Sequence, residues 1–156
     1  MKFELEKADG ATVVAHLFGA LSERSSESLR ALDAELVRKH VVFDMAGVNR
    51  VNPAGEALWA TLLNSVARRA DYEFRGCSVY FIEAVNRQPE LARGGKITSF
   101  HAPLKCPACR HSATVLLESA TVSPRSTFGA PPCGKCGRAM EAEVPPAAYF
   151  GFLFGD

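Results

Sequence analysis

The first hundred residues alternate between segments with the two-residue spacing of strands and segments with the 3.6-residue spacing of helices. Apolar and β-branched side chains predict strands at residues 3–7, 12–18, 40–45, 75–83 and 96–100. Between them we expect a helix with Leu29, Leu32, Leu36 and Val37 on one face, a second helix over 53–69 and a short third around 89–93. The order ββαβαβαβ implies an α/β fold in which a mixed sheet carries its helices mainly on one face.

Two local signals support these elements. Asp9-Gly10 separates the first two predicted strands and is typical of a hairpin turn. Before the second helix, Asn52 can cap the first turn, and Pro53 suits the first helical position, where an N–H would be unpaired anyway. Glu56 then lies in the first turn, where the helix dipole favours a negative charge.

Charge and hydrophobicity narrow the classes of function. The 156 residues are 47% hydrophobic, enough for a packed core, and their formal net charge is only +1. A chain with so little excess charge has no field of one sign to attract nucleic acid or anionic lipid. No run of about eighteen apolar residues occurs, so we expect no membrane-spanning segment.

Four cysteines form two Cys-x-x-Cys pairs, Cys106/Cys109 and Cys133/Cys136, with 23 residues between the pairs. Two residues between thiols allow one backbone turn to direct both sulfurs at a single point. Two such turns provide the four thiolates of a tetrahedral structural Zn²⁺ site. Gly134 and Gly137 fit this interpretation, because positive φ angles would turn backbone N–H groups toward the sulfurs.

Other chemistries suit the same four residues. The chain starts Met-Lys-Phe-Glu-Leu-Glu-Lys, unlike a secretory signal, so a reducing, cytoplasmic location is expected and two disulfides are disfavoured. A thiol redox pair and a rubredoxin-like iron site remain alternatives, since the spacing does not separate zinc from iron. With its two knuckles, segment 103–145 resembles a zinc ribbon, which implies one structural Zn²⁺.

A second resemblance rests on a predicted strand, Val41-Val42-Phe43-Asp44-Met45-Ala46-Gly47-Val48, followed by Val51-Asn52-Pro53-Ala54-Gly55. This segment is similar to the STAS family, which includes the bacterial anti-sigma-factor antagonists, and the likeness extends over about residues 1–100. In that family a strand ending in Asp leads to an Asp-Ser-Ser/Thr-Gly motif at a helix start. Asn52 falls on the family Asp, Pro53 on the first Ser, Ala54 on the phosphoacceptor and Gly55 on the glycine.

The family resemblance implies a protein-interaction module in signalling that cannot be phosphorylated at the usual place, because Ala54 has no hydroxyl. It also implies that loop 49–55 docks a protein partner, with Asn52, Pro53, Ala54 and Gly55 as contact residues. The partner would be an anti-sigma-type kinase or another subunit of a larger assembly. The alternative is that Asn52-Pro53 is an efficient helix start with no binding role.

We expect three parts: a STAS-like domain at 1–102, the zinc ribbon at 103–145 and an aromatic C-terminal tail at 146–156. The tail has four aromatic residues within 149–154, which are costly to leave in water. They either cover the protein's own surface or join it to a partner or a second copy as a homo-oligomer. The fifth cysteine, Cys77, is expected to be a small core residue.

No motif of an enzyme occurs, neither G-x-S-x-G nor H-E-x-x-H nor a phosphate-binding glycine loop, so we expect no catalytic residues. The alternative function is a nucleic-acid-associated zinc-ribbon protein, using basic residues of the ribbon and Phe128 to stack a base. Composition disfavours it, because acidic residues nearly cancel that charge. The basic residues are Arg110, Arg125, Lys135 and Arg138, and the acidic ones Glu118, Glu141 and Glu143.

Overall fold

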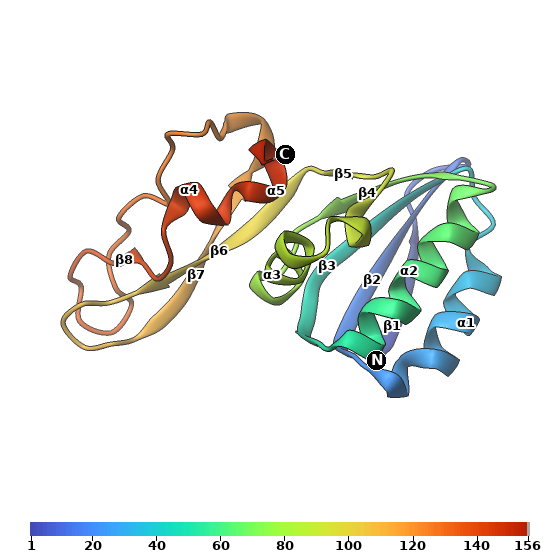
Figure 1. Ribbon diagram of the computed structural model, residues 1–156, viewed down its shortest axis with the longest axis horizontal. Helices are drawn as coiled ribbons and strands as arrows, with labels where there is room; N and C mark the ends of the chain where they lie inside the picture. Colours follow the sequence, from blue (N-terminus) through green and yellow to red (C-terminus); the bar gives the residue numbers. More distant parts are fainter. Residues whose placement is uncertain (156) are drawn as a thin grey trace.

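The computed structural model describes residues 1–155, which form a larger α/β lobe and a smaller β lobe (Figure 1). The first lobe contains β1 (Lys2–Lys7), β2 (Thr12–Leu21), α1 (Ser26–Glu35), β3 (His40–Val51), α2 (Pro53–Ala67), β4 (Asp71–Arg75), α3 (Val79–Arg87) and β5 (Lys96–Ile97). The second contains β6 (Ser99–Lys105), β7 (Ser112–Glu118), β8 (Glu141–Ala142), α4 (Pro146–Tyr149) and α5 (Gly151–Phe154). Short 3₁₀ turns cover Glu23–Ser25, Pro89–Ala92 and Ser119–Thr121.

The sheet of the first lobe has the order β1-β2-β3-β4-β5, with β1 antiparallel to β2 and the other neighbours parallel. On the face beneath the helices, aromatic side chains fill the core: Phe43 of β3 lies 5.1 Å from Trp59 of α2, and Phe74 of β4 lies 5.7 Å from Phe81 of α3 (ring centroids). The Trp59 indole N–H donates to the carbonyl of Leu91 at 3.0 Å, which pairs the one polar atom of this buried ring. The predicted fold class is confirmed. The predicted short helix around 89–93 is only a 3₁₀ turn, Pro89–Ala92, and the third helix of the lobe is α3.

The opposite face of this sheet is mostly polar, with Val14 and Val42 among its residues, and no helix of residues 1–155 covers it. His16 of β2 contacts Glu6 of β1 at 3.0 Å and Asp44 of β3 at 2.9 Å, and Arg75 of β4 lies 3.6 Å from Asp44. These groups therefore form a chain of ion-pair and hydrogen-bond contacts across four strands. Strand alternation places them opposite the apolar core positions.

The predicted strand 75–83 is wrong. Tyr72 and Phe74 point inward from a strand that ends at Arg75, and the apolar run beyond it is helix α3. The Ser78 hydroxyl caps this helix by accepting a hydrogen bond from the Phe81 N–H at 3.2 Å. The buried α3 residues recur with helical rather than strand spacing, because Phe81, Ile82, Ala84 and Val85 share one face.

Other boundaries shift by a few residues. β3 continues to Val51, because β2 continues beside it to Leu21, so part of the predicted loop 49–55 is strand. The segment 96–100 divides between two sheets, β5 and the first residues of β6. Val37 lies beyond the end of α1 and is 78% exposed, so its assignment to the apolar face of that helix is wrong.

The small lobe is a three-stranded antiparallel sheet with the order β7-β6-β8. β6 enters it directly from the first lobe, where the Cys77 N–H donates to the carbonyl of Ser99 and the His101 N–H to that of Cys77. Cys77 itself is fully buried, as predicted, and burial raises the pKa of its thiol. The boundary predicted at residue 102 falls inside β6, and whether the two lobes are separate folding units stays a prediction.

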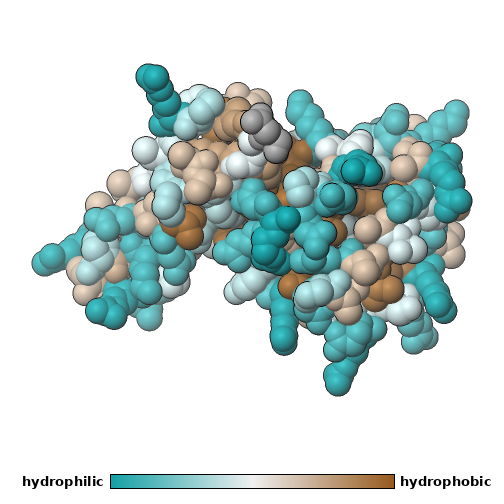
Figure 2. Space-filling model, in the orientation of Figure 1, coloured by the Kyte–Doolittle hydropathy of each residue, from teal (hydrophilic) through white to brown (hydrophobic). Residues whose placement is uncertain are grey.

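The aromatic tail packs where the lobes meet. Phe150 is 1% exposed and contacts Phe100 of β6 and Phe128, with ring centroids 6.0 and 5.5 Å apart. The Tyr149 hydroxyl donates to the carbonyl of His101, while Asn86 of α3 donates to the carbonyl of Tyr149. Figure 2 shows brown apolar residues gathered at this junction and a mostly hydrophilic surface over the small lobe. The alternative in which the tail covers the protein's own surface therefore holds for Tyr149 and Phe150.

This packing predicts unequal effects of two substitutions in the tail. Phe150→Ala removes a fully buried ring and should lower the free energy of unfolding by about 3–5 kcal/mol. Phe154→Ala is the matched control, since Phe154 is 44% exposed and its loss should change stability by only about 0.5 kcal/mol. Urea denaturation followed by circular dichroism measures both. Equal effects would show that the tail does not pack on Phe100 and Phe128.

Candidate metal centre and candidate docking site

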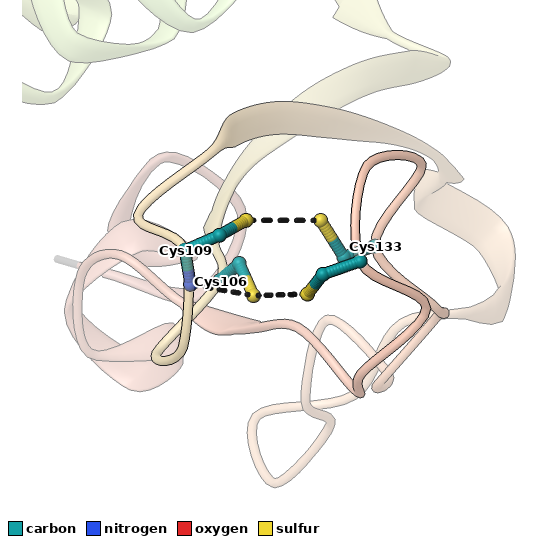
Figure 3. Close-up of side chains that lie close together, drawn as sticks. Cys106, Cys109 and Cys133 are labelled. Atoms are coloured by element: carbon teal, nitrogen blue, oxygen red, sulfur yellow. Dashed lines mark hydrogen bonds between the residues drawn. The ribbon is translucent and has the colours of Figure 1, made fainter.

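The four cysteines predicted as metal ligands converge at the end of the small lobe. The sulfurs of Cys106, Cys109, Cys133 and Cys136 all lie within 4.8 Å of one another. The Sγ atoms of Cys106 and Cys136 are 3.4 Å apart and those of Cys109 and Cys133 are 3.6 Å apart, facing each other from two loops (Figure 3). All four are free thiols, since a disulfide would bring two sulfurs to about 2.05 Å.

These separations fit one tetrahedral metal ion. Four sulfurs each about 2.3 Å from a central Zn²⁺ lie about 3.8 Å from one another, close to the distances between the facing pairs. A closed set of four sulfur donors leaves no position for a substrate, which is the pattern of a structural site. The predicted metal-ligand cluster is confirmed as a geometry able to bind a metal ion. Neither His101 nor His111 belongs to this cluster.

The two knuckles have the same backbone hydrogen bonds. In each, the first cysteine accepts at its carbonyl from the N–H four residues on, Arg110 for Cys106 and Gly137 for Cys133, both at 2.9 Å. The N–H of each first cysteine donates to the carbonyl five residues on, at 2.9 and 2.7 Å respectively. The backbone therefore closes both turns in the same way, and the sulfur positions follow from that repeated turn.

Positive φ occurs at one position of each knuckle, immediately after its second cysteine. Gly137 has φ of 78°, as predicted, whereas Gly134 is not among the residues with positive φ, so that prediction is wrong. In the first knuckle the equivalent position is Arg110, with φ of 63°. A non-glycine residue here carries conformational strain that the closed turn and the converging sulfurs must offset.

Backbone N–H groups point at the sulfurs and favour their charged form. The Cys109 N–H lies 3.5 Å from the Cys106 sulfur, and the Lys135 N–H lies 3.4 Å from the Cys133 sulfur. The N–H groups of Cys109 and Ala108 lower the pKa of the Cys106 thiol to about 6. Those of Cys136 and Lys135 lower the pKa of Cys133 in the same way. Thiolate is the form that binds metal, so the first cysteine of each knuckle is prepared for a metal ion. Burial and hydrogen bonds with the other three thiols instead raise the pKa of Cys109 to about 11.

The predicted docking residues lie at the start of α2, on the first lobe. The Asn52 side chain accepts from the Gly55 N–H at 2.8 Å and donates to Glu23 at 2.8 Å, so it caps the helix and is itself held. Pro53 and Ala54 are exposed at the first turn. A Cβ on Gly55 would lie 2.0 Å from the carbonyl oxygen of Leu21, so only glycine allows this approach.

A further contact fixes the helix start. Glu56 is buried, and its carboxylate lies 2.9 Å from the guanidinium of Arg87 on α3. The first turn of α2 is thus held by the Asn52 cap, by close packing at Gly55 and by this ion pair. Asn52, Pro53, Ala54 and Gly55 lie together as the sequence predicts, while their role in binding stays a prediction.

An open groove of about 600 Å³ lies between the two lobes and was not predicted from the sequence. Its walls come from the end of β3 (Asn49), from α3 (Tyr80 and Glu83), from β6 (His101) and from Glu143, which follows β8. Tyr80 is 53% exposed. No sequence signal could reveal this groove, because it is formed only when β6 carries the ribbon alongside α3.

The sequence matches no protein-family model and none of the curated proteins. Among solved structures it is similar to the anti-sigma factor antagonist SpoIIAA in its unphosphorylated form, with 20% identity, a TM-score of 0.42, and coverage of 53% of this chain and 79% of that one. It is also similar to the Bacillus cell fate determinant SpoIIAA in the phosphorylated form, with 19% identity, a TM-score of 0.46, and coverage of 61% and 89%.

None of the helices within residues 1–155 combines the length and the apolar content needed to cross a lipid bilayer.

The metal centre predicts a defined stoichiometry and pH dependence. Native mass spectrometry should find one metal ion per chain. Acidification should release it at a pH below about 6, the pKa of the metal-free Cys106 thiol, because protons must compete with the bound metal for the thiolates. A metallochromic dye measures the release. Cys136→Ser should lose the metal. Cys77→Ala should retain it, because Cys77 is buried outside the cluster.

Chelation tests the division of the chain. Removing the metal should unfold the ribbon, because a segment of about forty residues cannot bury enough apolar surface without a cross-link. The domain predicted at 1–102 should keep its structure, which amide hydrogen exchange can measure segment by segment. Simultaneous loss of protection in both lobes would mean that they share one core and that the boundary at 102 is wrong.

Proposed function

We propose that this chain is a non-catalytic regulatory module that docks a protein partner through the start of α2 on its STAS-like domain. The ribbon, held by one structural Zn²⁺, would provide a second contact surface. The observation that carries the proposal is the first turn of α2, where Pro53 and Ala54 are exposed. Three contacts fix its backbone: the Asn52 cap, the close packing of Gly55 and the ion pair of Glu56. A fixed, exposed turn costs little conformational entropy on binding, which favours recognition by shape.

Ala54 excludes phosphorylation at this position of the surface. The resemblance to the STAS family places the phosphoacceptor at this position, and a methyl group cannot accept a phosphoryl group. A phosphate here would add about 1.5 to 2 negative charges beside a helix N-terminus and change how a partner binds. Without it, docking at this surface would be constitutive, or controlled from elsewhere.

The groove between the lobes supports a joint role for the ribbon. Asn49, three residues before Asn52, lines the groove together with residues of the small sheet. A partner that covers the start of α2 and extends past Asn49 would therefore contact both lobes. We propose as partner an anti-sigma-type kinase or another subunit of an assembly, and a reducing, cytoplasmic compartment in which the four thiols keep their metal.

The docking proposal predicts that a bulky charge at the first turn of α2 abolishes partner binding. Ala54→Arg places a long cation on an exposed position without disturbing the core, so the protein should fold normally and lose its partner. Affinity purification from the native bacterium, with quantitative mass spectrometry, measures recovery. Val37→Arg is the matched control, since Val37 is exposed and lies outside this surface. Recovery of the same proteins with both variants, or of none with the wild type, would contradict the proposal.

The second candidate function is binding of nucleic acid by the ribbon, for which exposed Arg110, Lys135 and Arg138 provide a modest basic surface. One part of that hypothesis is wrong: Phe128 cannot stack a base, because it is 2% exposed and packs against Tyr149 and Phe150. If the ribbon bound nucleic acid, affinity would fall steeply with salt and would be lost on charge reversal of Arg110 and Arg138. We expect no retention on DNA or RNA at low ionic strength, measured by fluorescence anisotropy.

A further inference from the structure

The outer edge of the small sheet is formed by β7, and no strand within residues 1–155 pairs with its far side. Two hydrogen bonds show which way the backbone of β7 points: the Ser119 N–H donates to the carbonyl of Thr98, and the Cys106 N–H donates to that of His111. The odd-numbered residues from 111 to 119 therefore direct their backbone groups toward β6. Antiparallel strands alternate these groups from one side to the other. The backbone groups of Ser112, Thr114, Leu116 and Glu118 therefore face the open side.

This edge lacks the features that keep other strand edges from pairing. β1, the edge of the larger sheet, carries Lys2, Glu4, Glu6 and Lys7, and β5 and β8 are only two residues long. β7 is seven residues long, has no charge before Glu118 and no proline, and pairs with β6 without an irregularity. Leu116 is 52% exposed on its surface. A long, regular, uncharged edge is a ready template for another strand.

We infer that β7 joins two copies of this chain, edge to edge and antiparallel, so that two three-stranded sheets become one. This contact goes beyond the proposed function, since the start of α2 lies on the other lobe. One register uses all four outward-facing residues: Ser112 lies opposite Glu118 of the second copy, and Thr114 lies opposite Leu116. The two-fold axis then passes beside Val115, and each copy makes the same contacts with the other.

Charge along the edge favours a second copy in this orientation. Arg110 and Lys105, the β6 partner of Ser112, lie at one end of the strand, and Glu118 lies at the other. Glu141, the β8 partner of Lys105, lies on the side of β6 away from this edge, which leaves Arg110, unpaired within residues 1–155, as the positive charge nearest to Ser112. Antiparallel pairing brings the acidic end of each copy to the basic end of the other, whereas parallel pairing would bring like charges together. In this register the two exposed Leu116 side chains are diagonal neighbours and cover each other.

The contact between the two Leu116 side chains gives a specific test on the full-length, metal-containing protein. Sedimentation equilibrium should show a concentration-dependent dimer of the wild type. Leu116→Lys and Leu116→Glu, each alone, should weaken association by about tenfold or more, because each places like charges together and removes apolar burial. Mixing the two variants should restore dimers that contain one copy of each, identified by native mass spectrometry after isotopic labelling of one variant.

Val37→Lys and Val37→Glu are the matched controls, since Val37 is exposed on the other lobe, and they should leave the dimer unchanged. Circular dichroism should show that the Leu116 variants fold, because the side chain they alter lies on the surface. A protein that is monomeric at every concentration would overturn the inference. So would a dimer that withstands both Leu116 variants, or one that is lost with Phe154→Asp instead, which would assign the contact to the tail.

Discussion

A small lobe of three strands can bury little apolar surface, and this constraint explains why the chain after Ser99 combines a cluster of metal-ligand type with an aromatic tail. Its sheet has three strands, one of them two residues long, and β7 exposes Ser112, Thr114, Leu116 and Glu118 on one face. The four converging sulfurs lie at one end, where a metal ion would restrain them, and Tyr149 and Phe150 cover the other end. Between these two restraints, β6 and β7 keep a regular register over seven paired positions.

The predictable parts of the structure were those specified by local chemistry. Asn52 and Pro53 mark a helix start by their own hydrogen bonding and φ, and the Cys-x-x-Cys spacing determines where two sulfurs of one turn can point. The α3 segment was mispredicted because Val79-Tyr80-Phe81-Ile82 suits a buried strand as well as a helix. What decides between them is the Ser78 cap and the packing of Phe81 against Trp59, and the second of these is a tertiary contact.

The site shows the same division. Convergence of the two cysteine pairs followed from metal-ligand chemistry, whereas the strained φ at Arg110 did not, because arginine gives no sign of the left-handed conformation. The burial of Phe128 could not be predicted, since it depends on a tail more than twenty positions further on. The open edge of β7 also required the sheet order, because its seven residues are as regular as those of an inner strand.

The packing of Tyr149 and Phe150 also determines the order in which the protein can be completed during synthesis. The chain leaves the ribosome from its N-terminus, so the residues of the first lobe are available before those of the small lobe and the tail. Phe100 and Phe128 emerge well before the two aromatic residues that cover them, so nascent chains pass through a stage with both rings exposed. During that stage the cysteine knuckles are already available. A metal ion bound there would restrain the incomplete ribbon until Tyr149 and Phe150 pack on it.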